Sequence, residues 1–191
     1  MPVCIPATTS FINRDMKHYD FADTLHALWE KSCGLYLKGR HDAHTYFTAG
    51  ELAFLAANGL TAQHLYDYAE DFTSGGEPGW NTALAIELVR RDYFVNVQTG
   101  KPSAVVLDEA KMPAKTDAVR SIEWLPRIIP KTKAKLRGEL PASLMYCCGG
   151  DRRFFKAHDI HPAEFLSVVW RNEHHDSAII DWVVRRSAAA K

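Results

Sequence analysis

The sequence lacks an excess of charge of either sign. Its 191 residues include 23 Lys and Arg and 23 Asp and Glu, so the formal net charge is zero. Proteins that bind nucleic acids neutralise phosphates and usually carry a clear basic excess. The four basic residues between 131 and 137 spread round their predicted helix instead of forming one stripe. We therefore expect no nucleic-acid partner.

Long apolar runs and a cysteine framework are also missing. No stretch approaches the roughly 18 apolar residues of a membrane-spanning helix, and the first residues lack the basic and apolar segments of a secretory signal. The adjacent pair Cys147-Cys148 is poorly placed to bridge, because a disulfide between neighbours is strained. Cys4 and Cys33 complete the set without a framework spacing. These absences predict a cytoplasmic protein with no membrane association.

Apolar residues are plentiful and have helical spacing. The chain is 47% hydrophobic and has five Trp, seven Tyr and nine Phe, which is enough for a core without disulfides or structural metals. Steps of three and four residues predict helices over 21–36, 49–57, 62–72 and 81–98. We therefore predict a mainly α fold, a compact multi-helix domain.

Local signals mark several helix ends. Thr48 and Glu51 have the spacing of a capping box, and Thr61 is placed to cap the following helix. Asn58-Gly59 supplies a left-handed residue that ends the first of these helices. As an alternative to the end of the fourth helix, residues 94–107 could form one short β-hairpin around Thr99-Gly100.

The pattern divides the chain into four segments. Residues 1–15 have no periodicity and are expected to form an extended arm, followed by an N-terminal helical half over 16–100. Residues 101–116 contain two prolines and little pattern, which is typical of a linker. The C-terminal half, 117–191, is expected to hold helices over 117–125, 126–137 or 130–137, 151–157, 162–170 and 176–186.

The C-terminal half carries a family resemblance. It has a Leu125-Pro-Arg127 start, a Lys-rich segment that ends at Gly138, and a short turn with Cys148 and Asp151. On these motifs, residues about 118–185 resemble a family of uncharacterised bacterial proteins, domain of unknown function 5069. Two departures are Pro130, where an acidic residue is expected, and Gly149-Gly150 in place of Pro-Leu. The resemblance implies a helical bacterial domain and brings no catalytic residues.

The turn around Cys147 and Cys148 is the first candidate site. A thiol is nucleophilic as thiolate, and a helix N-terminus or nearby cations lower its pKa. Asp151 opens the next predicted helix, Arg152 follows it, and His158 lies one helix length away. We interpret Cys148 or Cys147 as a nucleophile and His158 as a proton-transfer group. The alternative is a buried cysteine pair beside a capped helix.

Substrate-binding candidates surround this turn. Arg127 and Arg152 are positioned in sequence to hold an anion, and Trp80 follows a Gly-rich loop where it could stack on a ligand or fill the core. Arg90-Arg91-Asp92 in the predicted long helix is typical of an ion-paired surface patch.

A second candidate site is a divalent-metal centre. His41 and His44 precede one helix, while His64, Asp67 and Asp71 share one face of another. Histidines with a carboxylate are a common ligand set for divalent metals. Surface histidines beside an acidic helix face explain the same residues. No other cofactor is expected.

Two classes of function follow. The first is a cytoplasmic enzyme that acts on a small anionic molecule at a site between the two helical halves. The second is a non-catalytic helical interaction module, a homodimer that buries exposed aromatic residues such as Trp170 and Trp182.

Overall fold

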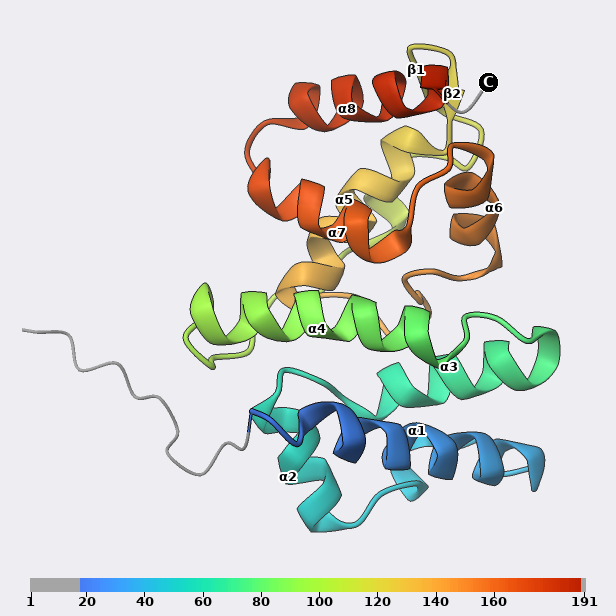
Figure 1. Cartoon of the computed structure of the whole chain (residues 1–191), viewed down its shortest axis with the longest axis vertical. Coiled ribbons are helices and arrows are strands. Elements are labelled where there is room, and N and C mark those ends of the chain that lie inside the picture. The colour runs from blue at the N-terminus through green and yellow to red at the C-terminus, as the bar shows by residue number, and fades with distance from the viewer. Residues whose placement is uncertain (1–17, 190–191) are drawn as a thin grey trace, which may run out of the picture.

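The computed structural model describes residues 18–189 (Figure 1). The extended arm predicted for residues 1–15 lies outside the described residues. In the described part, eight α-helices and a two-stranded antiparallel sheet form the molecule, which confirms the mainly α class.

The N-terminal elements follow the predicted pattern closely. Thr48 accepts a hydrogen bond from the backbone N–H of Glu51, and the Glu51 carboxylate accepts one from the Thr48 N–H at 2.7 Å, so the predicted capping box is confirmed. Thr61 caps the next helix, with His64 completing the box in place of an acidic residue. The elements are α1 (Phe21–Leu37), the 3-10 helix η1 (Ala43–Thr45), α2 (Ala49–Ala57), α3 (Ala62–Gly75) and α4 (Trp80–Asn96).

The C-terminal elements pack beyond α4. Helix α5 packs against α4, α7 and α8. It has a proline in its first turn and ends at Gly138, which is in a left-handed conformation. The elements are η2 (Glu109–Lys111), β1 (Ala118–Val119), β2 (Ile122–Glu123), α5 (Leu125–Arg137), α6 (Gly149–Ala157), α7 (Pro162–Arg171) and α8 (Asp176–Ala189).

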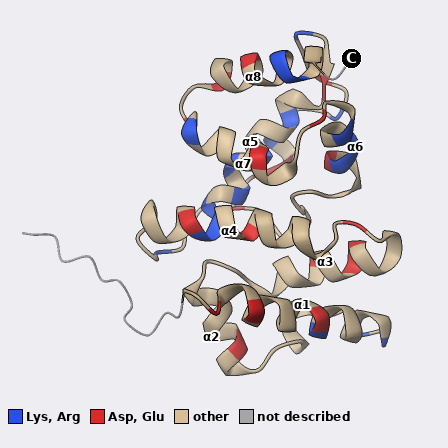
Figure 2. Ribbon diagram, in the orientation of Figure 1, with Lys and Arg blue, Asp and Glu red and all other residues tan. Residues whose placement is uncertain are grey.

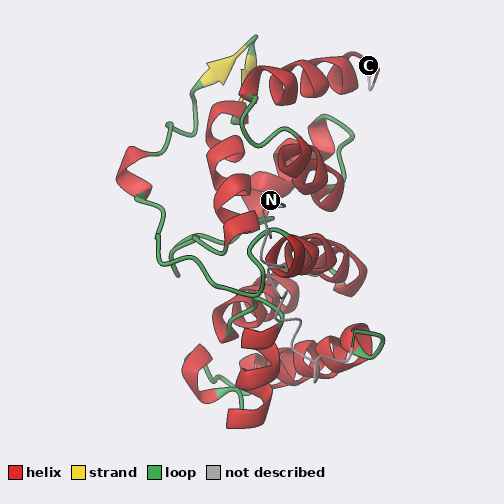
Figure 3. Cartoon of the chain, turned by 90° about the vertical axis from the view of Figure 1, so that its left-hand side faces the viewer, coloured by secondary structure: helices red, strands yellow, loops and turns green. Residues whose placement is uncertain are grey.

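Two local predictions are wrong. The helix expected over 117–125 is instead a tight hairpin, in which Ala118 pairs with Glu123 and Val119 with Ile122. Its turn uses Arg120 and Ser121, both with positive φ, which is incompatible with a right-handed helix. Figure 3 shows these strands at one end of the molecule. The alternative hairpin near 94–107 does not form: residues 94–96 belong to the end of α4, where Phe94 is buried, and residues 97–107 contain no strand.

The interior consists of two apolar clusters on either side of α4. Ala83 of α4 packs into the N-terminal cluster with α1 and α3, whereas Ile86 and Tyr93 pack into the C-terminal cluster with α5 and α7. In Figure 1, α4 lies between the two groups of helices.

None of the helices described for residues 18–189 is long and apolar enough to cross a membrane.

Candidate functional site

Two lysines of α5 are buried in the interior. Lys131 and Lys135 lie one helical turn apart, and each has a side chain only 3% exposed. Lys131 pairs with Asp151 of α6 at 2.7 Å, and Lys135 pairs with Glu87 of α4 at 2.6 Å. Figure 2 shows basic residues, coloured blue, along α5. Neither pair was predicted from the sequence, because the partners lie 20 and 48 positions away from the two lysines.

Glu87 organises a polar cluster between the halves. Its carboxylate accepts hydrogen bonds from the Tyr68 hydroxyl at 2.7 Å and from Lys135. The second oxygen, Oε2, is buried and has no partner in the described part of the chain. Burial alone raises the pKa of Glu87, but Lys135 and the other nearby groups overcome it and hold the pKa below its usual range. The carboxylate and the Lys135 ammonium thus compensate each other.

Arg90, one turn after Glu87 on α4, is a buried cation whose guanidinium lies 5.3 Å from the centroid of the Phe94 ring. It is 2% exposed, and its Nε and Nη1 atoms make no hydrogen bond to any residue in 18–189. A Cβ atom at position 138 would lie only 2.5 Å from the Nη2 atom of Arg90. Gly138, at the end of α5, therefore leaves room for the guanidinium. Burial lowers its pKa to about 10, which still leaves it charged at neutral pH. The expected ion-paired surface patch is therefore wrong at this residue.

Arg90 lines a cavity of about 440 Å³ between the halves. The wall is built by the end of α2, the first turns of α3, the middle of α4, the end of α5 and the loop that follows it. Besides backbone and apolar groups, the cavity is lined by His44, Gln63, His64, Asp67, Arg90 and Arg137.

Asp67 and His64 are the titratable groups of α3 at this cavity. Asp67 is 9% exposed and accepts a hydrogen bond from the Gln63 amide at 2.6 Å. Burial raises the pKa of Asp67 to about 6 and lowers the pKa of His64 to about 3. Near neutral pH, Asp67 is therefore mostly ionised but close to its pKa, and His64 is uncharged.

The other cation of the cavity is already paired. Arg137 donates to Glu173 at 2.6 Å, and Lys135 behind the wall is compensated by Glu87. Arg90 therefore stands out as the cation whose buried nitrogen atoms lack acceptors.

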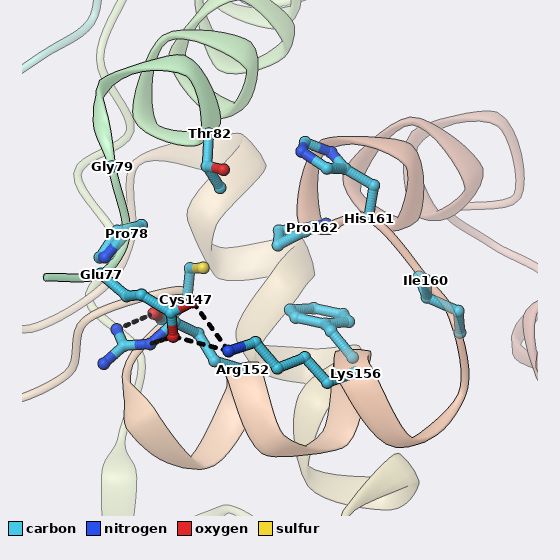
Figure 4. A pocket seen from close by; sticks show the side chains of 11 residues that line it. Glu77, Pro78, Gly79, Thr82, Cys147, Arg152, Lys156, Ile160, His161 and Pro162 are labelled. Atoms are coloured by element: carbon cyan, nitrogen blue, oxygen red, sulfur yellow. Dashed lines mark hydrogen bonds and ion pairs between the residues drawn. The ribbon is translucent and has the colours of Figure 1, made fainter.

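A smaller cavity of about 220 Å³ lies between the start of α4 and helices α6 and α7. Figure 4 shows Cys147 directed into it, beside Arg152 and Lys156. Both cations are paired: Arg152 donates to Asp71 at 2.6 Å and to the Cys147 carbonyl, and Lys156 donates to Glu77 at 2.7 Å. This cavity contains predicted site residues but offers a ligand little free charge.

The cysteine turn is held by Asp151, which is fully buried. Its oxygens accept hydrogen bonds from Lys131, from the backbone N–H of Cys147 at 2.9 Å and from the Trp124 indole at 3.1 Å. Burial, with Asp151 next to it, raises the pKa of the Cys147 thiol to about 12. This shift is opposite to the one that an activated thiolate requires.

The remaining predicted catalytic and anion-binding residues have separate partners. Half-buried Cys148 accepts a hydrogen bond from Lys131 at 3.3 Å. His158 meets the Ser187 hydroxyl at 2.8 Å, and Arg127 donates to the Pro113 carbonyl at 2.8 Å. The joint action of Arg127, Cys148 and His158 therefore stays a prediction.

The predicted metal ligands do not form one group. His41 packs edge-on against Tyr36, Asp71 pairs with Arg152, and His64 accepts a hydrogen bond from the Thr61 N–H in its helix cap. Among residues 18–189, no three His, Cys, Asp or Glu side chains are placed to hold a metal ion. Only His44 and His64 of the expected set share the larger cavity.

Trp80 packs on other rings of the N-terminal cluster. Its ring centroid lies 4.5 Å from that of His26 and 5.9 Å from that of Trp29. This arrangement corresponds to core filling, one of the two interpretations given above.

The structure therefore defines a mainly helical protein with two apolar clusters and a charged cavity between them. Residues 113–191 match the family described as domain of unknown function (DUF5069), which confirms the resemblance predicted for this part of the chain. No curated protein and no solved structure matched the chain.

Proposed function

We propose that the protein is a cytoplasmic enzyme that acts on a small anionic molecule bound in the cavity between its two helical halves. The observation that carries the proposal is Arg90, a charged guanidinium whose buried nitrogens have no acceptor at the wall of that cavity. The free thiols of Cys33, Cys147 and Cys148 support a reducing compartment.

An anionic ligand would satisfy a large unmet interaction. A buried polar group without a hydrogen bond costs about 1–3 kcal/mol, and more when the group is charged. A guanidinium presents donors in a planar fork that suits carboxylate and phosphate oxygens. Arg90 is placed to supply such donors, whereas Arg137 is occupied by Glu173.

The same cavity holds groups suited to proton transfer. Efficient general acid–base catalysis needs a pKa near the operating pH. Asp67, with its pKa raised by burial to about 6, meets this condition, and uncharged His64 lies one turn before it on α3. The chemistry is thus assigned to α3, not to the cysteine turn.

Thermal unfolding of three proteins tests the binding step: wild type, Arg90→Met, and Arg185→Gln as a control. Arg185 is an exposed residue of α8, a helix that contributes nothing to the cavity. Sodium phosphate, sulfate, acetate and glycine are the probes. A ligand present at ten times its Kd stabilises the fold by about 1.4 kcal/mol, or roughly 3–5 °C in a domain of this size. We expect such a shift for wild type and Arg185→Gln and none for Arg90→Met.

The unliganded proteins separate a binding role from a structural one. Met has a volume similar to that of Arg, and it removes a charge whose desolvation outweighs the attraction of Glu87. Arg90→Met should therefore unfold at the same temperature as wild type or higher. A large loss of stability in Arg90→Met without ligand, together with no ligand shift in wild type, would assign Arg90 to the fold and refute the proposal.

The interaction-module alternative has less support. Trp170 and Trp182, the aromatic residues expected to form an interface, are partly buried against the protein's own C-terminal cluster.

A further inference from the structure

We infer that the ligand of the Arg90 cavity is a zwitterion, a small molecule of the amino acid class whose carboxylate meets Arg90 and whose ammonium group meets Asp67. The inference rests on the proposed function and specifies its substrate class.

Arg90 and Asp67 are opposite charges on one wall that do not pair. Arg90 comes from α4 and Asp67 from α3, and both line the same cavity. Among the residues described, no ion pair joins them, and the hydrogen bond to the Asp67 carboxylate comes from the neutral amide of Gln63. Two buried, opposite charges that line one cavity without pairing are the complement of a ligand that carries both signs.

Neighbouring charges do not replace such a ligand. Arg137 is held by Glu173, and Lys135 and Glu87 compensate each other behind the wall. His64 adds no charge, because burial keeps its imidazole neutral. Glu87 and Glu139 attract the Arg90 charge, and Lys135 attracts the Asp67 charge. Among residues 18–189, however, no hydrogen bond joins Arg90 or Asp67 to a group of opposite charge.

A simple anion fits this arrangement less well. At pH 7.5 Asp67 is mostly ionised, since burial raises its pKa only to about 6, and its carboxylate repels a second negative charge. An ammonium group removes the repulsion and adds a charge-assisted hydrogen bond. The cavity of about 440 Å³ lies within the range of about 300–1,000 Å³ that is usual for small-molecule pockets.

Isothermal titration at pH 7.5 with size-matched pairs tests the inference. The probes are glycine, alanine, β-alanine and 4-aminobutyrate, each compared with the carboxylate that lacks the amine: acetate, propionate or butyrate. A hydrogen bond to a charged group predicts that at least one amino compound binds about ten- to a hundredfold more tightly than its partner. The carbon chain length of that compound reports the separation of the two charges.

Variants test which group of the ligand Arg90 and Asp67 each bind. Asp67→Asn should abolish the preference for the amino compound, while the plain carboxylate binds at least as tightly as before. Arg90→Met should abolish the binding of both compounds. Glu70→Gln changes an exposed carboxylate of α3 that does not line the cavity, and should keep the preference.

The outcomes distinguish the two levels of the proposal. If plain carboxylates or phosphate bind through Arg90 with no preference for an amine, or if Asp67→Asn keeps the preference, the zwitterion inference is wrong and anion binding stands. If neither set of probes binds, the proposed function itself is refuted.

Discussion

At the scale of single residues, burial of Asp67 couples the fold to pH. Its carboxyl is faced by Gln63, by Lys135 of α5, and by Glu70 and Asp71 of its own helix, and desolvation outweighs the favourable contacts. The pKa rises from 3.8 to about 6, so the folded state binds this proton more tightly than the unfolded state does. Ionisation of Asp67 therefore lowers stability as the pH rises from about 4 to 6, and the loss is complete above 6.

We predict that Asp67→Asn stabilises the protein more at high pH than at low pH. The substitution removes the ionisable group and keeps its shape, so the gain in unfolding free energy should be about 2 kcal/mol larger at pH 7.5 than at pH 4.5. Urea denaturation of both proteins at the two pH values measures the difference. An equal effect at both pH values would show that the carboxyl of Asp67 titrates normally.

Arg90 shows why the candidate site was only partly predictable. In sequence it stands in Arg90-Arg91-Asp92, and a run of charges on a helix is usually a solvated surface. Its burial depends on Gly138, which lies 48 positions later and leaves room for the guanidinium. No local pattern contains that contact. Asp67 and His64, by contrast, were recognised as sharing a helix face with Asp71, although the structure turns Asp71 away toward Arg152.

At the scale of elements, α5 is anchored by its two buried lysines. The Lys131–Asp151 pair fixes α6 and the cysteine turn, and the Lys135–Glu87 pair fixes α4. Removing one member of a buried pair leaves an uncompensated charge, which typically costs about 3–5 kcal/mol.

Asp151→Asn should therefore lower the free energy of unfolding by about 3–5 kcal/mol. The matched control is Asp176→Asn. Asp176 pairs with Lys133, which like Lys131 is on α5, at 2.5 Å, but the Asp176 side chain is half exposed. An exposed pair contributes about 0–1 kcal/mol, so the control should change little. Chemical denaturation of both variants compares the pairs, and similar losses would mean that burial does not set the strength of these contacts.

Helix prediction succeeded where the signals are local. Thr48 with Glu51, Thr61 before α3, and Pro162 in the first turn of α7 each act within a few residues, and the helices begin where these signals lie. It failed at 117–125, where Arg120 and Ser121 adopt positive φ in a turn that lacks glycine. That conformation is imposed by packing of buried Ile122 into the C-terminal cluster, which is a tertiary effect.

At the scale of the whole molecule, α4 belongs to both apolar clusters. Ala83 packs on one side and Ile86 on the other, and Arg152 reaches from α6 to Asp71 of α3. Loss of either cluster exposes a face of α4, which weakens the other cluster. The two halves are therefore expected to be coupled in folding.

We predict one cooperative unfolding transition for the protein. Trp29 and Trp80 report on the N-terminal cluster, and Trp124, Trp170 and Trp182 lie in or against the C-terminal cluster. Calorimetry should give a single peak whose calorimetric and van't Hoff enthalpies agree, with coincident fluorescence and circular dichroism curves. Two separated transitions would show that the halves are independent domains.

The central claim is that the buried guanidinium of Arg90 binds an anionic group of a ligand. The most direct measurement is isothermal titration of wild type and Arg90→Met with whichever probe raises the melting temperature most. The account predicts one binding site per chain in wild type and no binding in the variant, whose unliganded stability is undiminished. Equal affinity in the two proteins would contradict it.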